Sequence, residues 1–315
     1  MKKILVFKNC KLGDFITSIP SLNLIKEKYP DDKIYFLSHK NNYKIFIPKI
    51  IENTKLVDSF IFFNKKGNSF LMYVNLIVKI RKLKFDQFYY LQENSSKLTK
   101  IRIIRDYLFF YLCNIKKMTG FQYENPNYKV KSHTLEIAQR VKKNISKKKL
   151  FEKIIISIKP ELAHFKKKYI IFSIGGISSP AKWPISNWYS LTKLILDKYK
   201  NFKIILIGVK NENLIAEEIT KQNPKKIINM CGKTNFNLLC NILKNSKLVI
   251  TNDNGIMHLC SVYQKKIVAL FNNHDPEGKW YPLNAKAQIL RPYNGIQFLK
   301  PEKVFTTIIK NFKHL

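Results

Sequence analysis

The chain has 315 residues, 45% of them apolar, which is enough for roughly two domains with packed cores. It carries 57 Lys and Arg against 21 Asp and Glu, a formal net charge of +36. Its five cysteines are scattered and odd in number, which excludes a regular disulfide frame or zinc motif, and no apolar run approaches the roughly 18 residues of a membrane span.

The basic charge has two interpretations. It is larger in residues 1–160, which hold 33 basic and 12 acidic side chains. A solvated lysine surface without a particular partner accounts for it, and so does attraction for anionic surfaces or phosphorylated substrates. Lys2 and Lys3 lead directly into a short strand rather than a signal-peptide core, so we expect a cytoplasmic protein.

The first half alternates apolar strand-like runs with helical patterns. Residues 4–7 are typical of a buried strand, and a helix is predicted from Asp14 towards residue 30. Further strands are predicted at 33–37, 57–62, 88–91 and up to about 121, with helices at 70–82 and 98–115. Such alternation predicts an α/β fold with a doubly wound parallel sheet.

The second half repeats this pattern after residues 157–168, where Pro160 and a lysine run predict an interdomain linker. Strands are predicted at 169–174, 204–207, 248–250 and 267–271, with helices at 188–196, 214–220, 236–243, after 255 and at 301–312. We therefore expect two Rossmann-like domains, 1–160 and 161–315, that face a central cleft.

Several common site motifs are missing. No G-x-G-x-x-G follows the first strand, which disfavours a nicotinamide dehydrogenase, and the chain has no P-loop. No D-x-D pair follows a strand, so metal-independent chemistry is favoured.

Asp14 is the first candidate, because it follows the first strand where a loop meets a helix. One interpretation is a helix N-cap. The other is a general base at the carboxyl edge of the sheet, acting by its position, since a helix N-terminus and neighbouring lysines favour its ionised form.

The second half offers three more candidates. Lys182 lies in a loop between aromatic and proline residues, where it is either solvated or placed to neutralise a leaving phosphate beside the Gly175-Gly176 turn. Glu212 follows a strand end. Its carboxylate either accepts hydrogen bonds from ribose hydroxyls or lies in the first turn of a helix without contacting a ligand. His258 is either a partly buried structural histidine or a ligand-binding one.

These motifs resemble, in their order and spacing, those of family 9 glycosyltransferases, which include the bacterial heptosyltransferases of lipopolysaccharide core assembly. The motifs are Lys11-Leu12-Gly13-Asp14, Pro180-Ala181-Lys182-Trp183-Pro184, Gly208 with Glu212, Cys231-Gly232-Lys233-Thr234 and Asn252-Asp253-Asn254-Gly255-x-x-His258, with Leu91-Gln92 and Thr119-Gly120-Phe121. The resemblance covers nearly the whole chain.

The resemblance implies a GT-B fold and an inverting, metal-independent glycosyltransferase. The domain 1–160 would bind the acceptor and the domain 161–315 the nucleotide sugar, typically ADP-heptose, which is a co-substrate and not a cofactor. Asp14 would be the catalytic base, Lys182 would contact the donor diphosphate, and Glu212 would face the nucleoside. The remaining donor-binding residues would be Gly13, Gly176, Asp253, Asn254, Gly255 and His258.

The implied acceptor is an anionic, lipid-linked saccharide of the lipopolysaccharide core at the cytoplasmic face of the inner membrane. Residues 102–117 have basic ends and an aromatic middle. They either lie in the membrane interface or pack as domain core.

Two departures from the family lie beside the expected donor. Asn254 replaces a usual Thr, and Asn272-Asn273-His274 replaces a Gly-Pro-Thr-like turn. The sugar or base could therefore differ from those of the relatives. A nucleotide-sugar-binding relative without catalysis is the main alternative, whereas no helix-turn-helix, zinc-finger or RNA-binding signature supports nucleic-acid binding.

Overall fold

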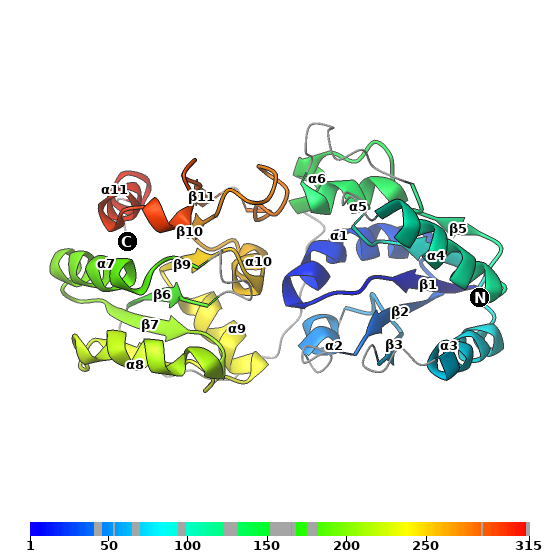
Figure 1. The fold of residues 1–315 in the computed structure, drawn as a ribbon, viewed down its shortest axis with the longest axis horizontal. Coiled ribbons are helices and arrows are strands. Elements are labelled where there is room, and N and C mark those ends of the chain that lie inside the picture. The colour runs from blue at the N-terminus through cyan, green and yellow to red at the C-terminus, as the bar shows by residue number, and fades with distance from the viewer. Residues whose placement is uncertain are drawn as a thin grey trace. The chain divides into compact units, whose positions relative to one another are not determined.

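The computed structural model describes residues 1–40, 46–52, 54–64, 70–93, 99–122, 132–151, 165, 168–175, 182–284 and 286–312. The chain divides into two compact units, Met1–Ile158 and Lys159–Leu315 (Figure 1). The predicted linker at 157–168 lies outside the described residues except for Phe165 and Lys168.

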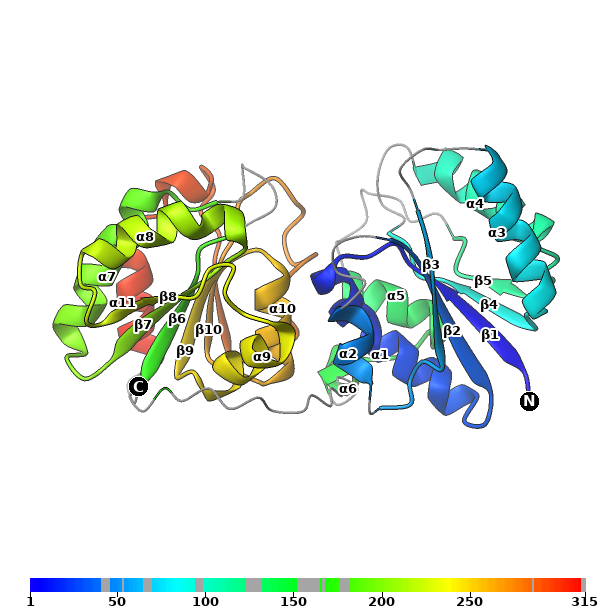
Figure 2. The same cartoon turned by 90° about the horizontal axis from the view of Figure 1, so that it is seen from below.

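Unit 1 contains a five-stranded parallel sheet with strand order β3-β2-β1-β4-β5. Its elements in chain order are β1 Lys3–Phe7, α1 Leu12–Lys28, β2 Lys33–His39, α2 Phe46–Ile51, β3 Ser59–Phe63, α3 Phe70–Leu83, β4 Gln87–Tyr90, α4 Thr99–Leu112, β5 Met118–Thr119, α5 His133–Val141 and α6 Lys147–Phe151. Helices α3 and α4 cover one face of the sheet, and α1, α2 and α5 cover the other (Figure 2).

The core between this sheet and α3 and α4 is rich in aromatic rings. The ring centroids of Phe88 and Phe110 are 4.2 Å apart, and those of Phe7 and Phe110 are 5.1 Å apart. These contacts fix α4 against strands β1 and β4, so the carboxyl ends of those strands form a rigid edge.

Unit 2 contains a six-stranded parallel sheet with strand order β11-β10-β9-β6-β7-β8. Its strands are β6 Tyr169–Ser173, β7 Lys203–Ile207, β8 Ile227–Asn229, β9 Leu248–Asn252, β10 Ile267–Leu270 and β11 Ala287–Leu290, and its helices are α7 Ile185–Lys198, α8 Asn213–Lys221, α9 Phe236–Asn245, α10 Gly255–Val262 and α11 Pro301–Asn311, with short 3-10 turns at Lys210–Glu212 and Ile296–Phe298. Helices α7, α8 and α11 cover one face, and α9 and α10 cover the other.

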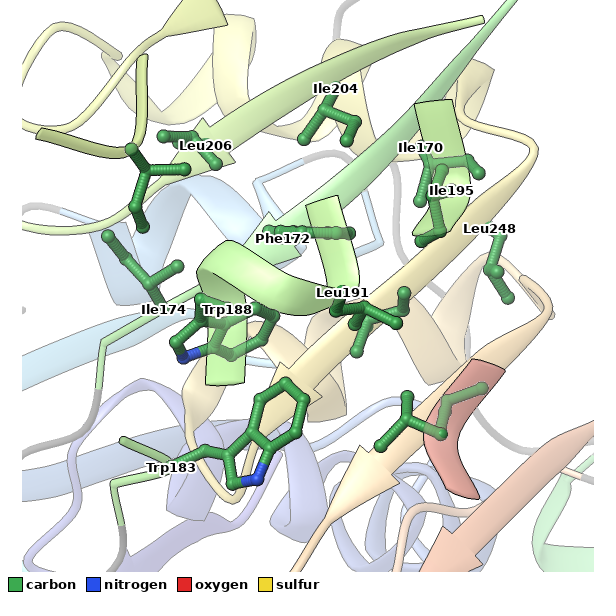
Figure 3. Close-up of a cluster of buried hydrophobic side chains, with 14 of the residues drawn as sticks. Ile170, Phe172, Ile174, Trp183, Trp188, Leu191, Ile195, Ile204, Leu206 and Leu248 are labelled. Atoms are coloured by element: carbon green, nitrogen blue, oxygen red, sulfur yellow. The ribbon is translucent and has the colours of Figure 1, made fainter. Parts of the chain in front are cut away.

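The core of unit 2 is centred on Trp188 of α7, which packs on Phe172 of β6 with ring centroids 5.0 Å apart (Figure 3). Trp183 joins this core from the loop before α7. Its indole nitrogen donates to the Leu299 carbonyl oxygen at 2.7 Å, so the residue after Lys182 is firmly anchored. The packing of these large rings fixes the loop before α7 against β6, at the carboxyl edge of the sheet where the candidate donor residues lie.

The predicted α/β class with doubly wound parallel sheets is confirmed, and most predicted elements are present. Two helix starts were predicted too late, because α1 begins at Leu12 and α7 at Ile185. The strands β8 and β11 and the helices α2, α5 and α6 were not predicted, since short elements give little periodicity. The five cysteines are all free and buried. Among the described residues, no helix has the length and apolar character needed to cross a membrane.

Candidate active site

Each sheet has one place where its strand order reverses. In unit 1 the chain moves outward from β1 through β2 and β3, then returns to place β4 on the other side of β1. In unit 2 the same reversal lies between β6 and β9. Ligands of open α/β sheets bind outside the carboxyl ends of the strands at such a reversal, so these two edges are the candidate sites.

Asp14 lies at the edge of unit 1, in the first turn of α1. The helix begins at Leu12 with Lys11 as its N-cap, so of the two interpretations of Asp14 the N-cap one is wrong. The Lys11 backbone N–H donates to Asp14 Oδ2 at 3.1 Å, which fixes the carboxylate at the third helical position. Within the described part of the chain, Asp14 Oδ1 has no hydrogen-bond partner, so this oxygen is available to accept a proton.

Lys8, which the sequence reasoning missed, lies directly after β1 and is only 2% exposed. Its Nζ is 2.9 Å from Nε2 of His133, the first residue of α5. Burial lowers the Lys8 pKa from 10.5 to about 8, and the negative charge of Asp14 is the largest influence in the other direction. An ammonium has no lone pair, so while Lys8 is charged it donates to Nε2, and the proton of a neutral His133 ring is then on Nδ1, 3.8 Å from Glu136 Oε2.

Glu212 lies at the edge of unit 2, where β7 leads into a 3-10 turn. Its carboxylate accepts from the Val209 backbone N–H at 2.7 Å, as Asp14 does from Lys11 in unit 1. A Cβ added to Gly175 would lie 2.3 Å from Glu212 Oε2, and one added to Gly208 would lie 2.4 Å from it. The buried carboxylate therefore occupies space that two glycines leave open.

Lys182 is close to this carboxylate. Its Nζ lies 4.0 Å from Glu212 Oε1, and its side chain is 40% exposed. The Asn252 side-chain oxygen accepts from the Trp183 backbone N–H at 3.3 Å, so the chain on one side of Lys182 is attached to the end of β9. The exposed ammonium thus extends from an anchored backbone, and the pair can bind an anion and a hydroxyl side by side.

Two asparagines connect β9 with the end of β6, across the reversal of unit 2. Asn252 Nδ2 donates to the Ile174 carbonyl oxygen at 3.1 Å. Asn254 Nδ2 donates to Gly175 O at 2.8 Å and to Ser173 Oγ at 3.0 Å, while its Oδ1 accepts from the backbone N–H groups of the first turn of α10. Asn254 is therefore both the N-cap of α10 and a bridge between the two loops.

The other predicted donor residues of this loop follow Asn252. Gly255 is the first residue of α10, and His258 is buried one turn further along. Asp253 lines a small depression with Asn272, His274 and Arg291, among others. Arg291 Nη2 donates to the Asp275 carbonyl oxygen at 2.7 Å, so the loop that follows Asn272-Asn273-His274 is held in place.

The Cys231-Gly232 turn supports the same edge. Gly232 adopts a φ of +70°, and its N–H donates to the Gly208 carbonyl oxygen at 2.9 Å. Burial, together with the charge of Glu212, raises the pKa of the Cys231 thiol to about 12, so this group stays protonated and packs as an apolar side chain.

The predicted residues thus fall into two groups. Gly13 and Asp14 lie in unit 1, whereas Lys182, Glu212, Asp253, Asn254, Gly255 and His258 lie at the carboxyl edge of unit 2. Gly176 lies outside the described residues. Lys8 could have been suspected from the sequence, because a lysine directly after an apolar strand lies at the carboxyl edge of a parallel sheet, where ligands bind, whereas nothing local marks His133.

Comparisons with known proteins define the class first. The structure superposes on that of an Escherichia coli protein described as ADP-heptose lps heptosyltransferase II with a TM-score of 0.72, 17% identity and coverage of 98% of each chain. Two doubly wound α/β units with this likeness place the chain in the GT-B fold class.

The family follows from the sequence comparison. The profile of glycosyltransferase family 9 (heptosyltransferase) matches residues 108–306, so the chain belongs to this family of transferase enzymes. It is 24% identical to lipooligosaccharide heptosyltransferase 2 of Campylobacter jejuni over 96% of both chains. It is 29% identical to the enzyme of the same name from Haemophilus influenzae over 41% of this chain, a match that spans 38% of that protein.

Proposed function

We propose that this protein is an inverting, metal-independent glycosyltransferase that moves a sugar, typically heptose from ADP-heptose, to an anionic saccharide of the lipopolysaccharide core. Family membership supports the transferase class. The names of its relatives, lipooligosaccharide heptosyltransferase 2 and ADP-heptose lps heptosyltransferase II, support the donor and the acceptor.

The observation that carries the proposal is the geometry of Asp14. One carboxylate oxygen is fixed by the Lys11 N–H, and the other has no partner among the described residues. Asp14 would remove the proton from an acceptor hydroxyl while the oxygen of that hydroxyl attacks the anomeric carbon of the donor sugar. The nucleoside diphosphate would leave in the same displacement. The anomeric configuration would therefore invert.

Lys8 would support this step from beneath the base. Its buried ammonium attracts the Asp14 carboxylate, while His133 Nε2 accepts a hydrogen bond from the ammonium and Glu136 Oε2 lies 3.8 Å from the other ring nitrogen of His133. A buried cation lowers stability unless it is compensated, so its retention at this edge fits a role in positioning Asp14.

The donor would bind at the edge of unit 2. The Lys182 ammonium would stabilise the charge that develops on the leaving diphosphate, a task for which no divalent cation is required. Glu212 would accept a hydrogen bond from the nucleoside, and Asp253, Gly255 and His258 would line the donor-sugar pocket. Asn254 uses its hydrogen-bonding groups within the protein, so it would shape this pocket through the Gly175 carbonyl group.

The acceptor would be lipid-linked, and the enzyme would act at the cytoplasmic face of the inner membrane. The excess of basic side chains in residues 1–160 suits an anionic, phosphate-bearing acceptor on unit 1.

A panel of nucleotide sugars tests this function. A donor present at 100 times its Kd stabilises the folded chain by about 2.7 kcal/mol, so the true donor should raise the melting temperature more than its analogues. Mass spectrometry should then show transfer of its sugar to a heptose-deficient lipopolysaccharide core. Binding of a donor without hydrolysis or transfer to any core acceptor would instead indicate a non-catalytic relative.

A further inference from the structure

Helix α4 has two apolar stripes rather than one. Ile103 and Phe110, together with Cys113 directly after the helix, face the core beside β1 and β4. A second stripe, spaced by three, four and three residues, faces solvent: Ile101 is 71% exposed, Ile104 60%, Leu108 54% and Tyr111 64%. When a helix is apolar on two opposite sides, the side that does not pack on the domain core needs another apolar surface to cover it.

Helix α3 extends this exposed surface. Phe70 is 85% exposed and Leu71 is 65% exposed, and both lie in the first turn of the helix. Helices α3 and α4 lie side by side (Figure 2). Tyr73 of α3 packs edge-on against Phe109 of α4, and Arg81 Nε donates to the Leu112 carbonyl oxygen at 2.7 Å, so α3 is joined to the last turn of α4.

We call this surface the α3–α4 face. It consists of Phe70, Leu71, Tyr73, Val78, Ile101, Ile104, Tyr107, Leu108, Tyr111 and Leu112, which are ten of the sixteen large apolar side chains exposed among the described residues. Scattered exposed apolar residues are ordinary, but their concentration on two neighbouring helices marks an interaction surface.

The exposed charges of the two helices are of one sign. Lys79, Arg81, Lys82, Lys100, Arg102 and Arg105 are the basic residues of the two helices. Their one acidic residue, Asp106, is buried, where its carboxylate accepts from the Tyr90 hydroxyl at 2.7 Å and pairs with Arg105. Apolar and aromatic side chains bordered by cations suit an anionic lipid surface. A second copy of the chain would bring an equally basic face, and like charges would oppose that pairing.

The position of this face is also informative. In a parallel sheet with βα connections, each helix begins at the carboxyl edge of the strand before it. Helices α1, α3 and α4 follow β1, β3 and β4, so all three helices begin at the carboxyl edge of the sheet of unit 1. Phe70, Leu71 and Ile101 therefore lie near the same edge as Asp14.

We propose that the α3–α4 face binds the surface of an anionic phospholipid bilayer. The apolar stripe would enter the headgroup region while the flanking lysines and arginines contact lipid phosphates. This inference deepens the proposed function, and only the biological purpose of lipid binding rests on that function. A lipid-linked acceptor held in the bilayer surface would present its saccharide to the edge of unit 1 that carries Asp14. Lipid binding itself requires no sugar transfer.

Vesicle flotation with the full chain tests the proposal. We expect binding to vesicles of phosphatidylglycerol and phosphatidylethanolamine, and much weaker binding to phosphatidylcholine alone. The triple variant Ile104→Ser, Leu108→Ser and Tyr111→Ser should lower the partition coefficient by about tenfold or more at both low and high salt. The variant Lys79→Gln with Lys82→Gln should lower it by roughly thirtyfold at low salt only, since each cation near the surface contributes about fivefold.

A matched control is available in unit 2. Leu214, Phe298 and Ile309 are exposed apolar residues outside the α3–α4 face, and their triple replacement by Ser should leave vesicle binding unchanged. Circular dichroism should show that all variants fold, because every replaced side chain is exposed.

A second measurement locates the contact directly. Since the five native cysteines are buried, Leu108→Cys supplies a reactive thiol for an environment-sensitive dye. Its emission should shift to the blue with anionic vesicles and be quenched by brominated lipid, whereas the same dye at Leu214→Cys should not respond.

The proposal is overturned if the wild type does not bind anionic vesicles at low salt, or if the stripe variant binds as well as the wild type. It is also overturned if light scattering shows an oligomer that the stripe variant abolishes while vesicle binding is absent, because the face would then join two copies. Transfer to a delipidated core oligosaccharide should be unchanged in the stripe variant, so failure of the transferase assignment would be seen separately.

Discussion

The Nζ atom of Lys8 lies 2.9 Å from Nε2 of His133, and both side chains are almost completely buried. The two residues are 125 positions apart, and the folding of unit 1 brings them together close enough to Asp14 for its charge to raise the pKa of Lys8. A lysine buried in this way lowers stability, because water no longer solvates its charge.

Replacement of Lys8 by Met should therefore raise stability and lower turnover. Below a folded-state pKa of about 8 the lysine is charged in both states, and the difference from the unfolded value of 10.5 corresponds to a cost on the order of 3 kcal/mol. Between about pH 8 and 10.5 the unfolded chain binds more protons, so wild-type stability should rise with pH and approach that of Lys8→Met. Chemical denaturation at pH 7 and pH 10 measures this.

The exposed residue Lys33 supplies the control, because Lys33→Met should leave both stability and turnover unchanged. Equal turnover of Lys8→Met and the wild type would show that the buried lysine has no part in positioning Asp14.

Replacement of Gly208 by Ala should displace the Glu212 carboxylate without unfolding the chain. The added Cβ would lie 2.4 Å from Glu212 Oε2, the end of a flexible side chain, so this carboxylate should move first; Cys231 Sγ at 3.0 Å and Glu212 Cβ at 3.2 Å need shift by only a few tenths of an ångström. Donor affinity should fall by about as much as in Glu212→Gln, and the double variant should be no weaker than either single variant. Isothermal titration of the donor measures all three, and additive losses would contradict the proposed role of Glu212.

Replacement of Asn254 by Thr introduces the residue that the family resemblance leads us to expect at this position. Threonine can still cap α10, but it cannot bridge to both Ser173 Oγ and Gly175 O. Loss of the bridge should cost about 1–3 kcal/mol of stability, and it should change the order of affinities across a panel of nucleotide sugars. An unchanged order would show that Asn254 does not shape the donor pocket.

Replacement of Lys182 by Ala should weaken donor binding and also lower kcat, because its ammonium would contact the diphosphate in both the ground state and the transition state. Lys182→Arg keeps the charge and should recover part of both losses. Steady-state kinetics with saturating acceptor measures the separate effects on the donor KM and on kcat. Unchanged kinetics in Lys182→Ala would mean that this lysine is only solvated.

The sequence alone was sufficient to predict the α/β class and the gathering of Lys182, Glu212 and Asn254 at one edge of the second sheet. Motifs that follow successive parallel strands must meet at one sheet edge, which is why Lys182, Glu212 and Asn254 lie together. It was not sufficient to predict that Glu212 fills the space left by Gly175 and Gly208, because that contact depends on how two loops approach each other.

The sequence also left the character of α4 open between membrane interface and domain core. A membrane-facing helix and a core helix can have the same amino-acid composition. Only the packing shows that Phe110 is buried while its neighbour Tyr111 is 64% exposed. The pairing of Lys8 with His133 was equally beyond local reasoning, since it requires the position of α5 against α1.

Turnover of the Asp14→Asn variant tests the central claim most directly. The amide oxygen can still accept from the Lys11 N–H, so the start of α1 should be preserved, but the side chain can no longer accept a proton from the acceptor. With the true donor and acceptor, kcat should fall by about a hundred- to ten-thousandfold while the donor Kd stays within about twofold of the wild type. A kcat equal to that of the wild type would contradict the assignment of Asp14 as the base.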